Sequence, residues 1–354
     1  MRIGIIAPPW IQIPPPKYGG IELVVYHLVE GLTALGEEVI LFGPKECEVS
    51  CKVIPYIENE AAYIGLDSSE NEKMLVAELS SKYGSAMAAC EGVDIIHDHT
   101  LSFPVVDIPT VHTLHGPATE GSVKRCVDLS KNKINNFVSI SEKQRILYNK
   151  IHSGINFVST VHNCVDVNQI ELKKDKEDFF LFVGRANWEK GLDLAIRVAS
   201  KAGVNLVMAV KMTEDFEKKF FRDEIMPWID KYPNHLFFQF HKEIPRHMIV
   251  DLYQRAKCTL FTSQWEEPFG LVMIESMACG TPVIALNRGA APEVIENGKT
   301  GFIVNTEEEM IKATKKIDKI KPEDCRKRVE DMFSRETMTK RYLQVYKDIL
   351  AKRK

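Results

Sequence analysis

The chain has 354 residues, which is too long for one ordinary domain and favours two lobes of roughly 170 residues each. Hydrophobic residues make up 45% of it and charged residues 27%, the balance of a soluble globular protein. The net charge of −3 argues against a globally basic protein that binds nucleic acid.

Charge is divided unevenly between the two halves. Residues 1–168 contain 13 Lys and Arg against 20 Asp and Glu, a net −7, whereas residues 169–354 contain 33 against 29, a net +4. A basic second half suits a ligand that carries phosphate, and an acidic first half argues against docking on anionic lipid. An ordinary solvated surface is the competing interpretation.

The eight cysteines form no C-x-x-C pair, and no His cluster at metal-ligand spacing lies near the closest two, Cys47 and Cys51. We therefore expect thiols in a reducing cytosol and no metal site. The first apolar stretch is interrupted by Pro8 and Pro9, and no apolar run approaches the ~20 residues of a membrane span. A cytoplasmic protein is expected. Membrane association is disfavoured, and whether the acceptor is lipid-linked stays open.

The chain opens with a strand, a loop and a helix. Arg2–Ala7 reads as a buried strand, residues 8–18 as a proline-rich loop, and the apolar spacing after Gly19-Gly20 as a helix that ends at Gly36. Backbone N–H groups at the start of that helix could face an anion, and a diglycine turn without a ligand is the alternative. The dinucleotide fingerprint G-x-G-x-x-G is absent.

Further strands and helices alternate up to about residue 161. Strands are predicted at 38–42, 94–99, 109–114, 136–141 and 155–161, and helices at 71–92 and from Glu142. This alternation predicts a parallel sheet with helices on both faces, in which ligands bind at the carboxyl ends of strands. Polar residues stand at those ends: His97, His99, His115, Ser141 and Asn163. We favour His115, which Gly116 and Pro117 follow, as a ligand contact.

A polar stretch at 167–178 suits an interlobe linker, and a second α/β series follows it. The strand 179–183 leads to Arg185, and Glu189-Lys190-Gly191 opens a helix that runs to about residue 202. Arg185 and Lys190 lie at a strand-to-helix turn, where two cations beside a helix N-terminus could clamp a diphosphate. A solvated pair of cations is the alternative.

The rest of this half repeats the pattern. Strands are predicted at 206–210, 236–240, 259–261, 282–286 and 302–304, with His241 in the loop after the second of them. Helices are predicted at 216–232, 248–256, 306–317, 322–333 and 335–351.

The stretch WEEPFGLVMIESMACGTPVIALNRGAAPEV at 265–294 carries the most chemistry. It predicts a loop, a helix, a tight turn and a strand, with Glu267 on the loop and Glu275 on the helix. Carboxylates accept hydrogen bonds from hydroxyls, so these two acids could hold different parts of a sugar nucleotide. Read alone, they could also form the acid–base pair of a glycosidase, and Glu275 could simply pair with Arg288.

Together these motifs resemble those of the retaining glycosyltransferases of family 4, which have the GT-B fold of two Rossmann-like, doubly wound α/β domains. The resemblance covers almost the whole chain. It rests on YGGIE at 18–22, HTLHGP at 112–117, SIS at 139–141, HNCVD at 162–166, FVGRANWEKG at 182–191, and the segments ACGTPVIA, GAAPEVI and NGKTGFIV after EPFGLVMIE.

The resemblance implies that Arg185 and Lys190 bind the donor diphosphate, that Glu275 holds the ribose and that Glu267 holds the transferred sugar. It also implies that the backbone at Phe269, Gly270 and Leu271 meets sugar and phosphates. Gly19 and Gly20 would close over the diphosphate, and His115 would lie at the reaction centre. His241 stands where many members have glycine beside the nucleobase, so the base stays open.

The resemblance further implies an acceptor-binding domain of residues 1–168 with 335–354 and a donor-binding domain of residues 169–334. The expected reaction moves a hexose from a nucleoside-diphosphate sugar, with a UDP-sugar as the leading donor, to an unknown acceptor, without cofactor or metal. The acceptor would bind in loops 8–18 and 59–69. A two-lobed sugar-nucleotide-binding protein and a sugar-nucleotide epimerase are the alternative functions.

Overall fold

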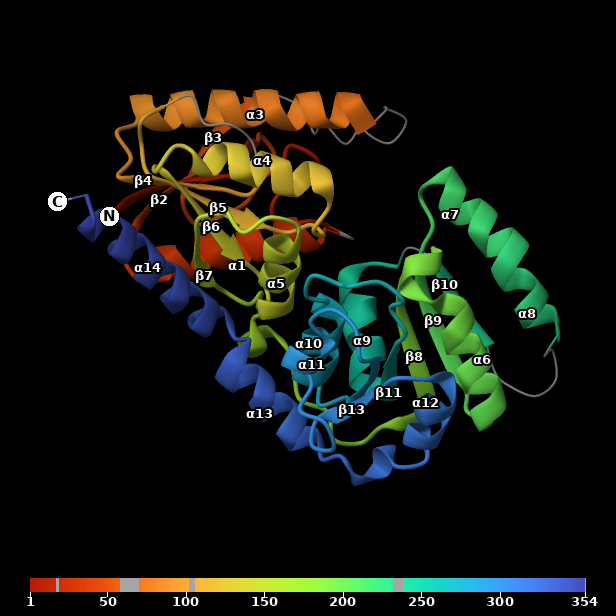
Figure 1. Ribbon diagram of the computed structural model, residues 1–354. Helices are drawn as coiled ribbons and strands as arrows, with labels where there is room; N and C mark the ends of the chain where they lie inside the picture. Colours follow the sequence, from red (N-terminus) through yellow and green to blue (C-terminus); the bar gives the residue numbers. More distant parts are fainter. Residues whose placement is uncertain (17–18, 58–69, 102–105, 232–237, 243, 354) are drawn as a thin grey trace. The chain divides into compact units, whose positions relative to one another are not determined.

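The computed structural model describes residues 1–16, 19–57, 70–101, 106–231, 238–242 and 244–353. The chain divides into two compact units, Met1–Cys164 with Arg335–Lys354 and Val165–Ser334. It passes between them at residues 164–165, slightly earlier than the division at 168–169 expected from the sequence. Each unit is a parallel sheet with helices on its faces (Figure 1), which confirms the predicted two-domain α/β fold.

Unit 1 has a seven-stranded sheet in the order β3-β2-β1-β4-β5-β6-β7. Its core strands are buried along their length, as in sheets covered on both faces. The strands are β1 Arg2–Ile6, β2 Glu38–Pro44, β3 Lys52–Ile57, β4 Ile95–Asp98, β5 Thr110–Leu114, β6 Asn135–Ser139 and β7 Phe157–Thr160. The helices are α1 Gly20–Ala34, α3 Glu70–Cys90, α4 Glu120–Ser130, α5 Glu142–Ile151 and α14 Arg335–Ala351.

The C-terminal helix α14 packs on α1 of the same unit (Figure 1). The two helices approach so closely at Gly31 that a Cβ there would lie 2.0 Å from Thr339 Oγ1 and 3.0 Å from its Cβ. Only glycine leaves room for this crossing. The end of the chain is therefore an integral part of unit 1.

Unit 2 has a six-stranded sheet in the order β10-β9-β8-β11-β12-β13. Its strands are β8 Glu177–Arg185, β9 Leu206–Lys211, β10 Phe238–Lys242, β11 Ala256–Phe261, β12 Val283–Leu286 and β13 Gly301–Val304. Its α-helices are α6 Leu192–Ala202, α7 Asp215–Phe220, α8 Met226–Lys231, α9 Arg246–Arg255, α10 Leu271–Ala278, α11 Ala291–Val294, α12 Glu307–Thr314 and α13 Pro322–Met332. Short 3-10 turns lie at Val167–Gln169, Trp188–Lys190 and Ile317–Lys319, and a π-helical segment at Phe221–Ile225 joins α7 to α8.

Most of the predicted elements are confirmed, with three differences. The strand β3 and the helix α4 were not expected from the sequence. His241 was predicted to lie in a loop, but it belongs to β10, where it pairs with Ala209 of β9. Tyr18, Glu243 and the predicted acceptor loop 59–69 lie outside the described residues.

Candidate functional site

Each sheet has one place where the strand order reverses, and ligands bind in α/β proteins at the carboxyl ends of the strands there. In unit 2 the reversal lies between β8 and β11, and in unit 1 between β1 and β4. The loop after β8 carries Lys190, and the loop after β11 carries Glu267. The sheet topology therefore brings two predicted site residues to one crevice.

Glu267 is the centre of a compact polar cluster in unit 2. Its Oε2 accepts from Lys190 Nζ at 2.5 Å, from Trp265 Nε1 at 2.7 Å and from Ser263 Oγ at 3.2 Å. The Lys190 ammonium also lies 5.2 Å from the centre of the Trp265 ring, within range of a cation–π attraction. One carboxylate oxygen is thus fixed by three donors.

The loops that carry this pair are locked together through their backbones. Gln264 N donates to the carbonyl of Glu189 at 2.7 Å, and Thr262 Oγ1 donates to the carbonyl of Lys190 at 3.0 Å. Asn187 caps the turn by accepting from Lys190 N at 3.2 Å. The ammonium of Lys190 is consequently positioned by ordered backbone on both sides of the crevice.

Arg185, at the end of β8, is held more loosely. Its guanidinium lies 3.5 Å from a carboxylate oxygen of Glu189 and 4.0 Å from Oε1 of the fully buried Glu217. The other oxygen of Glu217 accepts from the backbone N–H groups of Thr213 and Glu214. Arg185 is therefore anchored from one side and keeps donors that an anion could use.

The predicted contacts Phe269, Gly270 and Leu271 form the start of α10. Gly270 caps the helix with φ 90°, and a Cβ there would lie 2.7 Å from Met273 Cε and 2.9 Å from Phe261 Cζ. Phe269 is buried and packs edge-on against Phe333 at 5.8 Å. The N-cap residue Gly270 makes no side-chain cap, so the first N–H groups of α10 suit an anion.

Glu275 lies one turn further along α10 and is buried. Its Oε1 lies 2.8 Å from a guanidinium nitrogen of Arg246, and its Oε2 accepts from the hydroxyl of Tyr253 at 3.3 Å. The neighbouring Glu275 carboxylate raises the pKa of Arg246. The suggested pairing of Glu275 with Arg288 is wrong, because Arg288 donates instead to the carbonyl of Gln264.

Sequence reasoning missed Arg246, Tyr253 and Ser263 as partners of the two glutamates. Arg246 begins α9 and Glu275 lies on α10, so only the packing of these helices reveals their pairing. Trp265 and Ser263 stand beside Glu267 in the sequence, and that proximity to a candidate acid was an available signal. With both carboxylates held by cations, neither has the environment of a free general acid.

In unit 1, His115 directly follows β5 and contacts a second histidine. Its Nε2 lies 2.9 Å from Nδ1 of His99, which follows β4. Burial lowers the pKa of His115 to about 4, so its ring is neutral near pH 7. Gln144 of α5 holds the flanking backbone by donating to the carbonyls of Leu114 at 2.9 Å and Gly116 at 2.7 Å.

The other polar residues at strand ends have structural partners, with one exception. His97 contacts Tyr346 at 2.6 Å and Thr113 at 2.7 Å, which ties the sheet to α14. Ser141 caps α5 by accepting from Gln144 N. Asn163 keeps a buried carbonyl oxygen without a hydrogen-bond partner among the described residues.

Gly19 caps α1, and its carbonyl accepts from Leu23 N at 3.0 Å. Gly19 has no side chain with which to cap the helix, and the first turn includes the buried Glu22. The start of α1 follows the β1 side of the reversal point, so Gly19 and Gly20 occupy the position where α/β sheets bind anions.

His241 on β10 keeps a buried Nε2 without a hydrogen-bond partner among the described residues. The preceding Phe240 packs against Phe221 of the π-helical segment at 4.8 Å. The ring of His241 therefore has an unused polar atom on the strand two places from β8.

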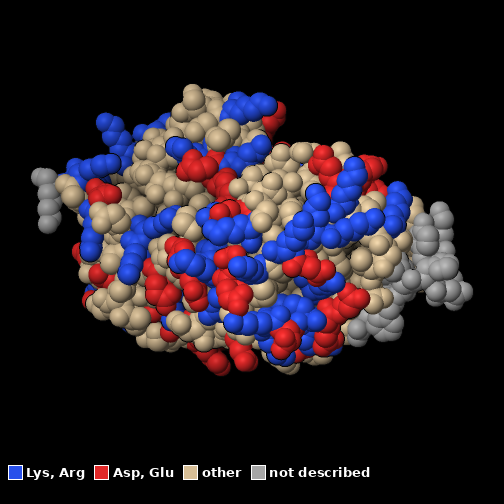
Figure 2. Space-filling view, turned by 90° about the horizontal axis from the view of Figure 1, so that it is seen from below, with Lys and Arg blue, Asp and Glu red and all other residues tan. Residues whose placement is uncertain are grey.

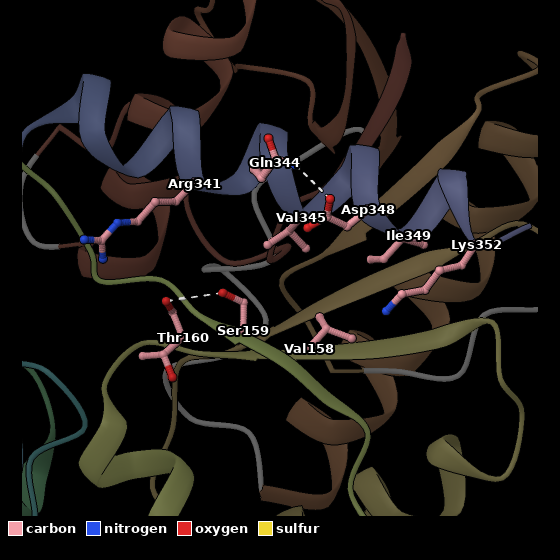
Figure 3. Close-up of a pocket in the computed structure, with 9 residues that line it drawn as sticks. All are labelled: Val158, Ser159, Thr160, Arg341, Gln344, Val345, Asp348, Ile349 and Lys352. Atoms are coloured by element: carbon pink, nitrogen blue, oxygen red, sulfur yellow. Dashed lines mark hydrogen bonds between the residues drawn. The ribbon is translucent and has the colours of Figure 1, made fainter.

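Two open recesses lie away from these residues. One of about 330 Å³ lies between β7 and α14 in unit 1, where Arg341 and Lys352 extend from the helix and Val158, Ser159 and Thr160 line the strand side (Figure 3). Another of about 560 Å³ lies in unit 2 against Lys173, Lys176 and Arg255. Neither recess is lined by a predicted site residue.

Opposite charges are interleaved on the surface. On the face seen in Figure 2, Lys and Arg alternate with Asp and Glu in small groups. Glu307 contacts both Arg197 and Lys201, as one example.

All eight cysteines are free thiols, and within the described ranges no His, Cys, Asp and Glu cluster could hold a metal ion. No helix in this part of the chain is long and apolar enough to cross a membrane.

Comparison with known proteins gives two adjacent family matches. The model described as Glycosyltransferase Family 4 matches residues 18–169, and the model described as Glycosyl transferases group 1 matches residues 166–334. An uncharacterized 41.2 kDa protein in the cps region of Klebsiella pneumoniae is 30% identical over 231 residues, which are 62% of this chain and 56% of that protein.

Solved structures share the architecture over nearly the full length. Sucrose-phosphate synthase from Thermosynechococcus elongatus has a TM-score of 0.80 at 18% identity, with 99% of each chain covered. The Anabaena protein HepE, solved in complex with UDP-glucose, has a TM-score of 0.69 at 16% identity, covering 98% of this chain and 100% of its own. With this fold and both family matches, the protein is a GT-B enzyme of the glycosyltransferase class.

Proposed function

We propose that the protein is a retaining glycosyltransferase that moves a hexose from a UDP-sugar to an acceptor that is still to be identified. The observation that carries the donor assignment is the pairing of Lys190 with Glu267 across the β8–β11 reversal point. A cation for phosphate and a carboxylate for hydroxyls then occupy one crevice. The complex of the structurally similar HepE with UDP-glucose supports uridine as the base.

In this proposal each part of the donor has its own residues. Arg185, Lys190 and the first N–H groups of α10 neutralise the diphosphate, on which negative charge grows as the glycosidic bond to phosphate breaks. Glu275 accepts from the ribose hydroxyls, and Glu267 from hydroxyls of the hexose. Phe269, Gly270 and Leu271 bring backbone close to the sugar and phosphates.

Unit 1 supplies the remaining groups of the proposed reaction. Gly19 and Gly20 provide backbone N–H groups at the start of α1 for the diphosphate, and His115 provides its ring to the transferred sugar. No metal or organic cofactor enters this proposal, because protein cations and helix N-termini provide the positive charge. The acceptor is a small molecule or a glycan.

A thermal-shift screen of UDP-, GDP- and ADP-sugars tests the donor assignment. A ligand that binds the native state raises the melting temperature by mass action, so UDP-sugars should give the largest shift. A larger shift with GDP- or ADP-sugars would overturn uridine as the base. The absence of any shift would overturn nucleotide-sugar binding as a whole.

The stereochemical assignment has a test that needs no acceptor. Glycosyltransferases can transfer slowly to water, and proton NMR distinguishes the anomers of the released sugar before they equilibrate. A retaining enzyme releases the anomer of the donor first, and the opposite anomer would contradict the proposal. Conversion of the donor into a different UDP-sugar would instead support an epimerase, and binding without any turnover would support a binding protein.

A further inference from the structure

The contact between His99 and His115 has the geometry of a hydrogen bond in the plane of both rings. The two nitrogens are 2.9 Å apart, the ring centroids are 5.2 Å apart and the planes differ by 24°. The centroid separation is the N···N distance plus about one ring radius on each side, so the rings meet edge to edge. One imidazole must therefore donate its proton and the other must accept it.

The second nitrogen of His99 shows which ring donates. Burial lowers the pKa of both histidines, so each ring is neutral and carries a single N–H. His99 Nε2 is buried and has no hydrogen-bond partner among the described residues. A buried N–H without an acceptor is rare, whereas an unshared lone pair is better tolerated. The proton of His99 therefore belongs on Nδ1.

We infer that His99 is a positioning residue whose Nδ1–H donates to His115 Nε2 and so fixes the proton of His115 on Nδ1. His115 then presents an N–H to its ligand and no free lone pair. It acts as a hydrogen-bond donor, and the ligand atom that it meets is an acceptor such as a hydroxyl or phosphate oxygen. The role of His115 toward substrate rests on the proposed function, but the tautomer does not.

The titratable side chains packed around His99 and His115 do not compete for the hydrogen bond between these two rings. His97, whose ring centroid lies 4.1 Å from that of His99, uses both nitrogens on Tyr346 and Thr113. The carboxylate of Asp98 lies 3.2 Å from His112 Nδ1 and accepts from Thr100. His112 Nε2 contacts Asn135 at 3.0 Å. Each neighbouring titratable group thus has its own described partner.

Nitrogen NMR of the full-length protein, labelled with ring-¹⁵N histidine and free of ligand, tests the tautomer directly. The His115 signals are those that a His115→Gln variant loses. We expect a protonated, pyrrole-type Nδ1 and an unprotonated, pyridine-type Nε2 for His115 at pH 7.5. A protonated Nε2 on His115 would overturn the inference. The tautomer is measured on the wild-type protein, and the variant serves only to assign its signals.

Two variants test whether His99 sets the tautomer of His115. His99→Asn can place a carboxamide N–H where Nδ1 stands, whereas His99→Phe keeps a ring of similar shape without a donor. We expect the Asn variant to retain the Nδ1–H form of His115 and the Phe variant to show averaged tautomer signals. If His115 stays in the Nδ1–H form in folded His99→Phe, then His99 does not position it. His99→Ala replaces the Phe variant if the latter does not fold.

A kinetic readout separates this inference from the proposed function. With a working donor, His99→Phe should lower the transfer rate roughly tenfold, and His99→Asn should recover most of it. A confirmed tautomer without any nucleotide-sugar binding would remove the proposed function and leave the positioning role intact. Normal transfer by folded His99→Phe would overturn the functional part of the inference.

Discussion

Lys190 and Glu267 lie 77 positions apart in the sequence, yet their charged groups are 2.5 Å apart at the reversal point of the unit 2 sheet. The carboxylate proposed for the sugar thus orients the cation proposed for phosphate. A donor that inserts there adds anionic oxygens to a preformed site, which lowers the cost of ordering.

Replacement of Lys190 by Ala should therefore slow transfer by about 100-fold, because a fixed cation near the growing phosphate charge is lost. Steady-state kinetics with the best donor measures this effect. Lys201→Ala is the matched control, since Lys201 also forms an ion pair, with Glu307, outside the crevice. Equal losses in the two variants would mean that Lys190 acts only on stability.

Replacement of Glu275 by Gln should weaken nucleoside-diphosphate binding roughly tenfold, because an amide cannot accept both ribose hydroxyls as a carboxylate does. Titration calorimetry with UDP measures the affinity. Glu307→Gln is the control, because Glu307 begins α12 and pairs with Arg197 of α6. An unchanged affinity in folded Glu275→Gln would remove the ribose assignment.

Arg246→Ala should also weaken UDP binding, although Glu275 itself is unchanged in this variant. The change leaves a buried carboxylate with only the Tyr253 hydroxyl, which costs about 1–3 kcal/mol and frees the side chain to move. Arg255→Ala is the control at the other end of α9, where Arg255 pairs with Glu177 and Asp251. The positioning of Glu275 by Arg246 is contradicted if both variants bind UDP as tightly as wild type.

Gly270→Ala should destabilise unit 2 and disturb the start of α10. The left-handed backbone costs about 1–3 kcal/mol for alanine, and the new Cβ meets Met273 and Phe261. Gly203→Ala separates these causes, because Gly203 has φ 71° but open space around its Cβ position. Urea unfolding should show a larger loss of unfolding free energy for Gly270→Ala than for Gly203→Ala. Equal losses would mean that the contacts of the new Cβ with Met273 and Phe261 cost nothing.

Acidification should weaken unit 1 through its buried histidines. At pH 7.5, above the ordinary histidine pKa of about 6.5, the folded and unfolded states are both neutral and the full stability is present. As pH falls, the unfolded chain binds a proton that folded His115, with a pKa of about 4, does not bind. The free energy of unfolding should therefore drop by about 1.4 kcal/mol per pH unit for this residue between those values.

Urea unfolding at pH 7.5, 6 and 5 measures this slope. His115→Asn should lose less stability than wild type over that range, because the group that resists protonation is gone. His247→Asn removes an exposed histidine and should follow the wild-type slope. Parallel curves for wild type and His115→Asn would contradict the prediction.

Sequence patterns predict the fold well where strands are apolar and helices are periodic. They fail at β3, because Lys52–Ile57 contains Pro55 and has too little apolar alternation to mark a strand. They fail at α4, whose largely polar residues are ordered by a capping box between Thr119 and Ser122. Both elements depend on packing and capping that hydrophobic periodicity does not express.

The candidate site, like the fold, is only partly predictable from the sequence. Four charged residues are visible in the predicted pattern: Arg185 and Lys190 at a strand-to-helix turn, Glu267 on a loop and Glu275 on the helix that follows it. The partners that orient them are less visible, because Arg246 meets Glu275 only when α9 packs beside α10. His99 could be predicted at a strand end, but its contact with His115 depends on the register of β4 and β5.

The two points where the chain enters and leaves unit 2 are neighbours. Val165 N donates to the carbonyl of Phe333 at 3.0 Å, and Val165 and Ser334 form a parallel bridge. Adjacent ends are the hallmark of a module that can be inserted into, or excised from, a host chain. Residues 165–334 therefore have the topology of an inserted domain. A short linker from Cys164 to Arg335 would join the two segments of unit 1 into one continuous chain.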